Sequence, residues 1–365
     1  MFEKSNLTTG VFFSDTLPAA QRGKTISLSG RQKSIYVSDA RVHDANFAFL
    51  STTLAKLHKQ VYEPKSYFTY AEDVPIDTGG GFVDYVEYMS VSWAGIMNDT
   101  RNIFGNNGNL IPRVNASMTQ NRVPVFTYEI AYDLRFVELE KMKKVNLQKS
   151  IDKIYEEGIL VGFDYFAQTV AYTGINGNSG LFNSANVLVG TIDNSETTGK
   201  GFEGLSDAEI VGFFNGVFTR YLTDTNMNIH LLPNVFLVPT FVSEELGNRM
   251  SALYTSTLLD FIKEHNIGKA QVGENFKIEI KSRPALDDLG TAGHGRIVAY
   301  RKEKEYVRLD MPYPIQHYIT LPNVEKMAYT TAFVGQISVI QLPYNESSAQ
   351  LGVVTYWDFT TDASL

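Results

Sequence analysis

Hydrophobic and polar positions change from a strand-like pattern to a helical pattern near residue 132. Residues 82–97 and 110–132 are rich in β-branched and aromatic side chains, and a polar segment lies between them. This composition is typical of strands, so the two segments predict a long two-stranded excursion with a polar tip. A two-stranded ribbon is only marginally stable by itself in water, so we expect this one to lie against another chain.

A long helix is predicted soon after the excursion. Residues 134–144 have the pattern of a short charged helix, and residues 147–173 continue for about 26 residues, roughly 40 Å at 1.5 Å per residue. The apolar face of the long helix comprises Ile151, Ile154, Ile159, Val161, Phe163, Phe166 and Val170. Gly158 and Gly162 lower the helix propensity, but glycines four residues apart allow another backbone to approach. Such a helix favours a structural or assembly protein over an enzyme.

The N-terminal region has no sustained hydrophobic period. Residues 1–45 mix Gly, Ser, Thr and basic side chains, which predicts an extended arm with brief strands. Residues 44–61 then have helical spacing, with Asp44 as a candidate N-cap. We expect that helix to end before Pro64.

The pattern changes to alternating helices and strands from residue 206 onward. Ser206 and Glu209 form a candidate capping box at the start of the first helix. The predicted helices cover residues 206–222, 243–249 and 257–264. The predicted strands cover residues 235–238, 276–280, 296–300 and 306–309. The chain is strand-rich after Pro314, so a compact α/β module is expected to precede a set of returning strands.

Charge and composition narrow the classes of function. The chain has 365 residues, 44% of them hydrophobic, and a formal net charge of -8 at pH 7. The acidic balance argues against a dedicated nucleic-acid binder, although local contact with phosphates is compatible with it. The chain has no cysteine, which excludes disulfides and thiolate metal sites and fits a reducing compartment. No apolar run is long enough for a membrane-spanning helix, and residues 1–15 lack the pattern of a signal peptide.

The sequence contains no motif of catalysis or metal binding. The six histidines have no paired-ligand spacing. Asp77-Thr78-Gly79 resembles the aspartic-protease triplet, but it occurs once and that chemistry needs two carboxylates. Residues 291–295 read as the loop before a strand rather than as a phosphate cradle. We therefore predict that the chain is not an enzyme and has no catalytic residues, no metal and no cofactor.

Several short motifs occur in an order that resembles one protein family. They are Trp93-Ala94-Gly95, Leu110-Ile111-Pro112-Arg113-Val114, Tyr128-Glu129-Ile130-Ala131-Tyr132-Asp133-Leu134-Arg135, Gly180-Leu181-Phe182-Asn183, Leu231-Leu232-Pro233, Ile297-Val298-Ala299-Tyr300 and Met311-Pro312-Tyr313. Together with the order of arm, ribbon, long helix, α/β module and returning strands, they make residues 67–365 resemble the major capsid proteins of tailed bacteriophages. Each motif is short, so their order and spacing carry the resemblance.

The resemblance implies the α+β fold named after phage Hong Kong ninety-seven. Its expected parts are an N-terminal arm (1–66), an extended two-stranded E-loop (67–131), a P domain with a spine helix (132–203), an A domain (204–315) and P-domain return strands (316–365). The implied function is a shell subunit that assembles as hexamers and pentamers around a double-stranded DNA genome, in a virion built in the bacterial cytoplasm. The implied partners are further copies of the chain, a portal protein, a scaffolding protein, decoration proteins and packaged DNA, with no membrane.

Three groups of residues are expected to serve assembly. We expect the E-loop to contact a neighbouring subunit through Trp93, Ile96, Asn98, Phe104, Leu110 and Arg113. We expect the spine helix to pack through Ile151, Ile154, Gly158, Gly162 and Phe166. We expect weak, sequence-independent contact with DNA from Arg22, Lys24, Arg31, Lys33, Lys141, Lys143 and Lys144.

Two other interpretations stay open at this point. An encapsulin-type compartment would share the fold but enclose enzymes instead of a genome. An α/β enzyme centred on residues 204–315 would require titratable groups that converge in a pocket.

Overall fold

The computed structural model describes most of the chain from residue 66 onward. The described residues are 25–26, 35–36, 66–94, 115–143, 151–193, 201–225, 227–250, 256–343 and 353–360. β1 (Thr25–Ile26) and β2 (Ile35–Tyr36) pair antiparallel in a unit of their own. The elements from residue 66 onward form a second unit. The helix expected at residues 44–61 lies outside the described residues.

One part of the second unit is a five-stranded sheet. Its strands lie in the order β6 (Leu188–Asp193), β13 (Val354–Thr360), β9 (Arg296–Tyr300), β7 (Val235–Val238) and β8 (Glu279–Ser282). β7 and β9 have the predicted bounds, whereas β8 begins three residues later than predicted. β13 pairs with β6 on one side and β9 on the other, so strands from outside residues 204–315 complete this sheet. The strands expected over residues 316–365 are therefore divided between two sheets.

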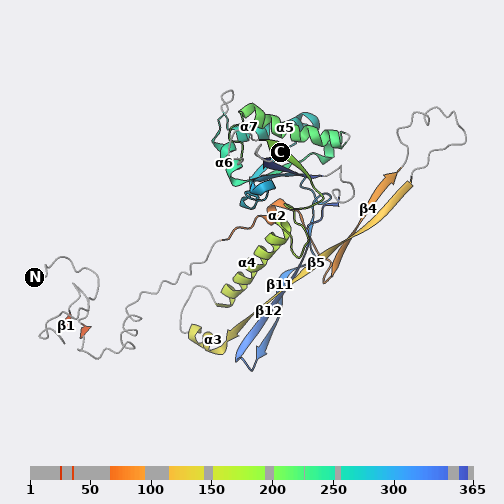
Figure 1. The fold of residues 1–365 in the computed structure, drawn as a ribbon. Coiled ribbons are helices and arrows are strands. Elements are labelled where there is room, and N and C mark those ends of the chain that lie inside the picture. Colours follow the sequence, from red (N-terminus) through yellow and green to blue (C-terminus); the bar gives the residue numbers. More distant parts are fainter. Residues whose placement is uncertain are drawn as a thin grey trace, which may run out of the picture. The chain divides into compact units, whose positions relative to one another are not determined.

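Four helices accompany the five-stranded sheet (Figure 1). They are α5 (Asp207–Asp224), α6 (Thr240–Asn248), α7 (Leu258–Glu264) and α8 (Ile267–Val272). α5 begins at the predicted capping box, in which the Ser206 N–H donates to the Glu209 carboxylate at 2.7 Å and the Glu209 N–H donates to the Ser206 hydroxyl at 3.4 Å. α6 begins earlier than predicted because Pro239 occupies its N-cap, where the fixed φ of proline suits a helix start. The shared core includes Phe214, Phe218, Phe236 and Phe359.

A second sheet is built around one 21-residue strand, β5 (Asn115–Arg135). Its order is β11 (Tyr313–Asn323), β12 (Ala328–Ser338), β5 and β4 (Tyr85–Ala94) (Figure 1). Residues 115–124 of β5 pair antiparallel with β4, and residues 125–135 pair antiparallel with β12. The prediction of a two-stranded excursion is therefore confirmed for β4 and residues 115–124. It is wrong for residues 125–131, because β12 joins the sheet there.

The predicted long helix is α4 (Ile151–Tyr172), and the short helix α3 (Phe136–Lys143) precedes it. The buried positions of α4 recur at helical spacing and include Ile159, Phe163, Ala167 and Val170. The rings of Phe163 and Phe166 lie with their centroids 5.6 and 5.2 Å from that of Tyr128 on β5. Gly162 allows this approach, because a Cβ there would lie 3.1 Å from the Tyr128 hydroxyl oxygen.

Three short elements lie outside the two larger sheets. α2 (Tyr70–Asp73) leads into β3 (Ile76–Thr78), which pairs parallel with β10 (Leu309–Met311). The strand predicted at residues 306–309 thus lies slightly later, at β10. One hydrophobic cluster contains buried side chains from α4, β9, β10 and β12, so a single core joins the helix to both sheets.

Candidate assembly surfaces and the network beneath them

The ribbon, defined as β4 with residues 115–124 of β5, exposes apolar side chains. On one face, between 45% and 67% of the surface is exposed for Tyr85, Met89, Val91 and Met118. The same face carries a polar group in which the Arg122 Nε lies 2.6 Å from the Glu87 carboxylate and the Gln120 amide also donates to it. Exposed apolar side chains around a small polar centre are the kind of surface that a protein partner covers.

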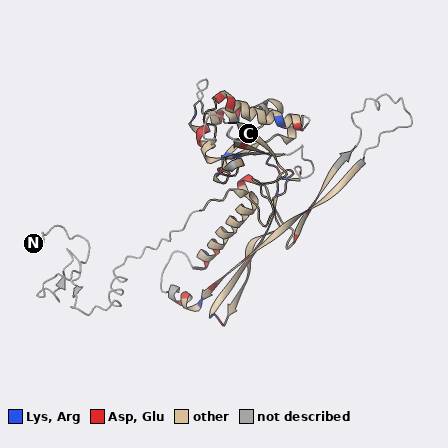
Figure 2. Ribbon diagram, in the orientation of Figure 1, with Lys and Arg blue, Asp and Glu red and all other residues tan. Residues whose placement is uncertain are grey.

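The outer part of β11 is a second exposed surface. Residues 316–322 are all exposed, and β11 is an edge strand that contains no Lys, Arg, Asp or Glu. Figure 2 shows β4, β5, β11 and β12 mostly in the colour of uncharged residues. The exposed apolar side chains here are Tyr318, Ile319, Leu321, Val324 and Met327. Uncharged edge strands are open to contact with other chains, because charges are a common means of keeping edges apart.

α4 also exposes single apolar side chains. They are Tyr155, Leu160 and Tyr165, and neighbouring rings cover the two tyrosines in part. The Tyr155 ring stacks on Tyr132 with centroids 5.1 Å apart, and the Tyr165 ring packs edge-on against Phe68 at 4.8 Å. The helix is thus apolar on its core side and partly apolar on its outer side.

A buried ion pair holds α2 to the five-stranded sheet beneath these surfaces. Asp73 is fully buried and accepts two hydrogen bonds from the Arg283 guanidinium, both at 2.6 Å. The Tyr172 hydroxyl at the end of α4 donates to the same carboxylate at 2.6 Å, and the Tyr300 hydroxyl donates to the Asp73 carbonyl at 2.8 Å. The Asp73 carboxylate therefore connects α2 to α4 and to the segment after β8, and the Asp73 carbonyl connects α2 to the end of β9.

Burial and charge act in opposite directions on the pKa values of this network. Burial by itself would lower the pKa of Arg283, but the hydrogen bonds and negative charge of Asp73 outweigh it and raise that pKa. Burial and the neighbouring Asp73 carboxylate raise the pKa of Tyr172. Arg283 is therefore charged and Tyr172 is neutral across the physiological pH range.

A second buried ion pair fixes β13 in the five-stranded sheet. The Arg296 guanidinium donates to both oxygens of fully buried Asp358, at 2.6 and 2.9 Å. Arg296 also donates to the Phe182 carbonyl at 2.7 Å, and the Thr291 N–H donates to Asp358 at 2.9 Å. This pair joins the C-terminal strand to the loop after α4 and to the loop before β9.

The described residues contain no cluster of metal-binding side chains. Among them, no three His, Asp or Glu side chains are placed to hold a metal ion. Two carboxylates, those of Asp73 and Asp358, are buried and paired with arginine. No helix in the described part of the chain is long and apolar enough to cross a membrane. The chemistry that stands out is that of contact surfaces.

Comparison with known families agrees with this geometry. The profile described as "Major capsid protein" matches residues 99–349, which is well over half of the chain. The chain belongs to the major capsid protein family. None of the curated proteins matches it.

Solved structures with the same fold include capsids of tailed phages. The similarity to the capsid of Myoviridae phage XM1 covers 85% of this chain and 98% of the capsid chain, with a TM-score of 0.65 and 13% identity. Microbacterium phage Oxtober96 is similar over 88% of this chain and 100% of its own, with a TM-score of 0.53 and 12% identity. The capsid of the native GTA particle has a TM-score of 0.54 and 8% identity, over 88% and 100% of the two chains. The expected Hong Kong ninety-seven type fold is thus confirmed.

The E-loop contact residues expected in this major capsid protein lie almost wholly outside the described residues. Trp93 lies in β4, where its backbone pairs with Ala116. The others fall in the segment between residues 94 and 115, which the structure does not describe, and are Ile96, Asn98, Phe104, Leu110 and Arg113. Their contact with a neighbouring subunit stays a prediction.

The expected spine residues of the major capsid protein take different positions in α4. Phe166 packs against Tyr128, and Gly162 gives room to the same tyrosine. Ile154 is half-buried, and Ile151 begins the helix. Gly158 is exposed, and a Cβ added there would have no atom within 4 Å in the described part of the chain. Within the described part of the subunit, the neighbour of Gly162 is therefore a side chain, and the predicted approach of another backbone to these glycines stays a prediction.

The expected DNA-facing residues lie in α3 or outside the described residues. Lys141 and Lys143 belong to the last turn of α3. The remaining members lie outside the described residues and are Arg22, Lys24, Arg31, Lys33 and Lys144. Their role in contacting DNA stays a prediction.

Sequence reasoning missed the exposed methionines of the ribbon and both buried ion pairs of the major capsid protein. The alternation of Tyr85, Glu87, Met89 and Val91 on one face of β4 was a usable signal, because strand residues two apart share a face. The pair of Asp73 with Arg283 had no local signal, because 210 residues separate the two side chains.

Proposed function

We propose that this major capsid protein assembles as hexamers and pentamers into a closed shell around double-stranded DNA. The ribbon of one subunit lies against a neighbouring copy, and no enzymatic step is involved. Residues 1–66 serve as an N-arm, the ribbon as the E-loop, α4 as the spine of a P domain, and the module centred on residues 204–315 as an A domain. The similar structures from phage XM1 and the GTA particle are capsids, which supports this proposal.

The exposed apolar face of the ribbon is the observation that carries the proposal. Met89 and Met118 each expose about two thirds of their surface on a strand pair beside which the described residues place no third strand. A ribbon of this kind gains little stability from its own contacts. Burial of apolar surface contributes roughly 25 cal/mol per Å², so a neighbouring subunit that covered this face would stabilise both ribbon and assembly.

Electron microscopy of the purified full-length protein tests the proposal directly. We expect closed shells with fivefold and sixfold capsomers. Particles that remain monomers or open rings at every concentration and salt condition would overturn it. Shells that purify with an enclosed enzyme and without nucleic acid would favour the encapsulin-type interpretation instead.

Contact with DNA is proposed to be weak and independent of sequence. The basic residues of the N-terminal region and of residues 141–144 supply the cations, and the net charge of -8 limits the total attraction. Phosphate contacts release counterions, so binding should fall steeply as salt rises and should not distinguish two unrelated duplexes. Tight, salt-resistant binding of one duplex over the other in a titration would contradict the capsid role.

Further partners follow from the same proposal. A portal protein at one vertex, a scaffolding protein during assembly and decoration proteins on the outer surface are proposed to contact the shell. Assembly is proposed to occur in the bacterial cytoplasm before the virion is released. Copurification of the tagged subunit from infected cells, followed by mass spectrometry, tests these partners together.

A further inference from the structure

Strand β13 enters the five-stranded sheet between two strands that do not pair with each other. It pairs parallel with β6 and antiparallel with β9. In the described part of the chain β6 pairs with β13 alone, so without β13 the sheet separates into β6 and the group of β9, β7 and β8. A slot one strand wide thus lies between β6 and β9, and the chain fills it with a strand of its own.

One side of the slot, with its helices, comes from a single stretch of sequence. β7, β8 and β9 and the helices α5 to α8 lie within residues 207–300, and their core includes Phe214, Phe218 and Phe236. β13 begins only at residue 354, and β11 and β12 of the long sheet precede it. Contacts between distant segments form more slowly than local ones, because the chain must first close a long loop. The compact stretch can therefore form before β13 reaches it.

Side chains of β13 complete the packing on both faces of the sheet. Val354 and Tyr356 belong to the hydrophobic cluster that contains the buried side of α4, whereas Phe359 belongs to the cluster of α5. Trp357 pairs with Gly190 of β6, where a Cβ would lie 2.5 Å from Trp357 Cε3, so glycine leaves room for the ring. An empty slot would leave apolar surface of both clusters in contact with water, and β13 removes that surface from water.

A buried charge couples the filling of the slot to one side chain of β13. The Arg296 guanidinium pairs with both oxygens of Asp358, and the Arg296 side chain is 13% exposed. Arg296 also donates to the neutral Phe182 carbonyl. Burial of a guanidinium without a carboxylate is unfavourable, so Arg296 must stay hydrated until Asp358 arrives. The slot therefore excludes water around Arg296 only when β13 is in place.

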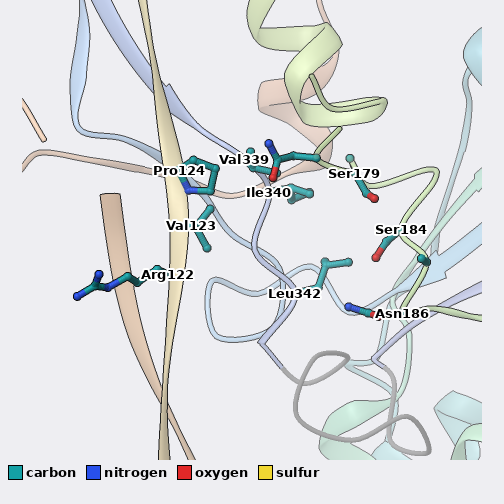
Figure 3. Close-up of a pocket in the computed structure, with 12 residues that line it drawn as sticks. Arg122, Val123, Pro124, Ser179, Ser184, Asn186, Val339, Ile340 and Leu342 are labelled. Atoms are coloured by element: carbon teal, nitrogen blue, oxygen red, sulfur yellow. The ribbon is translucent and has the colours of Figure 1, made fainter. Parts of the chain in front are cut away.

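The loop after α4 also relies on β13. The Tyr356 hydroxyl donates to the Leu181 carbonyl at 2.6 Å and accepts from the Ser184 N–H at 3.0 Å. Ser184 also borders a cavity of about 180 Å³, which Val123 and Pro124 of the ribbon line as well (Figure 3). The ribbon thus does not pack closely against this part of the loop, and Tyr356 supports it from the sheet.

We propose that β13 enters its slot last, and that this step makes completion of the subunit conditional on an intact β13. Residues 207–300 and α4 reach their structure first, and residues 354–360 then bind between β6 and β9 as a tethered strand. The inference concerns folding of one subunit and does not depend on hexamers, pentamers or DNA. A chain with a damaged β13 keeps an open, hydrated slot.

Tryptophan fluorescence tests this order, because the chain has two tryptophans and one of them is Trp357. In full-length Trp93→Phe protein, Trp357 reports the filling of the slot, since the Arg220 guanidinium carbon lies 5.1 Å and the Phe213 ring centroid 5.3 Å from its ring. Far-ultraviolet circular dichroism reports the helices during the same refolding. A brief unfolding pulse before refolding keeps the prolines in their native isomers, which removes slow phases from isomerisation.

We expect the Trp357 signal to reach its native value more slowly than the helical signal, by on the order of tenfold. Equal rates for the two signals, or a faster Trp357 signal, would overturn the proposal.

Asp358→Asn separates late entry from general loss of stability. An interaction that forms after the helices have folded leaves their folding rate unchanged and speeds unfolding. We therefore expect a helical refolding rate within about twofold of the parent protein, a slower Trp357 phase and faster unfolding. Slowing of the helical phase by the same factor as the Trp357 phase would overturn the proposal, because β13 would then belong to the folding nucleus.

Thr291→Val is a milder variant that keeps the test decisive if Asp358→Asn does not fold. It removes the hydrogen bond from the Thr291 hydroxyl to Asp358, at 2.8 Å, and keeps the Arg296 pair. Thr330→Val is the matched control, because it removes a hydrogen bond of 2.6 Å to Asp133 in the long sheet. We expect only Thr291→Val to slow the Trp357 phase. Equal slowing in both variants, or in neither, would overturn the proposal.

Discussion

The five-stranded sheet and the long sheet place apolar side chains in opposite ways. All four residues of β7 are buried, and Phe214, Phe218 and Phe236 belong to the hydrophobic core that this sheet shares with its helices. In the long sheet, residues 316–322 of β11 are all exposed, and Met89 and Met118 lie open on the ribbon. The two sheets belong to one unit of the same chain and are joined through one core.

The difference indicates which sheet is complete within the subunit. A sheet with helices against it satisfies its apolar residues by folding, so substitutions there change the stability of the subunit. A ribbon with exposed apolar residues contributes little to that stability, and its substitutions should change association instead. The expected outcomes below run from the largest change in the free energy of unfolding to the smallest.

Phe214→Ala tests the five-stranded side of the comparison. Phe214 is 1% exposed in α5, so we expect its removal to lower the free energy of unfolding by about 4 kcal/mol through lost burial and a cavity. Denaturant titration measures the change, and Met118→Ala in the ribbon is the matched control with little expected effect. Equal losses in both variants would mean that the ribbon is part of the subunit core.

Asp73→Asn tests the ion pair that ties α2 to the five-stranded sheet. It leaves the Arg283 guanidinium buried beside a neutral amide, and we expect a loss of about 3 kcal/mol. Asp77→Asn is the control, because its pair with Lys304 is exposed and such pairs contribute at most about 1 kcal/mol. A loss for Asp73→Asn no greater than for the control would show that this network does not hold the two parts together.

Gly158→Ala and Gly162→Ala compare two helical glycines four residues apart. Alanine at Gly158 meets no atom of the described chain, so we expect a gain of about 0.5–1 kcal/mol from helix propensity. Alanine at Gly162 must displace the Tyr128 hydroxyl and should lose that gain. If Gly158→Ala stabilises the subunit but prevents shells in electron microscopy, a neighbouring subunit approaches the helix at that point.

Met89→Asp combined with Met118→Asp tests the ribbon side. Exposed substitutions usually change the free energy of unfolding by less than about 0.5 kcal/mol, so the subunit should remain folded. Two charges on the apolar face should prevent a partner from covering it, and light scattering should show unassembled protein. Normal shells from this variant would rule the face out as an assembly surface.

Glu209→Gln tests the capping box of α5 through its pH dependence. Hydrogen bonds from the Ser206 N–H and hydroxyl hold the pKa of Glu209 below its ordinary value of 4.5. A lowered folded-state pKa contributes stability above the unfolded-state value, and this contribution disappears as pH falls through the folded-state value. The advantage of wild type over Glu209→Gln in denaturant titrations should therefore shrink below about pH 4.5. A difference that stays constant with pH would show that the carboxylate charge is not involved.

The sequence by itself determined the elements whose signals are local. The helical spacing of Ile159, Phe163 and Val170 predicted α4, because side chains three and four apart share one face of a helix. The apolar run 235–238 and the capping box at Ser206 predicted β7 and the start of α5 for similarly local reasons. The order of these elements, together with the order and spacing of the short motifs, indicated the capsid fold.

Only the tertiary structure decided which distant segments meet. β13 pairs with β6 across more than 160 residues, and β12 joins β5 at Val125, since strand pairing depends on long-range contacts that no local pattern specifies. The pair of Asp73 with Arg283 exists because the fold buries both side chains together, where each charge requires the other. The tertiary structure also decided the exposure of Met89. A hydrophobic residue in a strand pattern predicts a buried face, and only the fold shows that this subunit leaves Met89 uncovered.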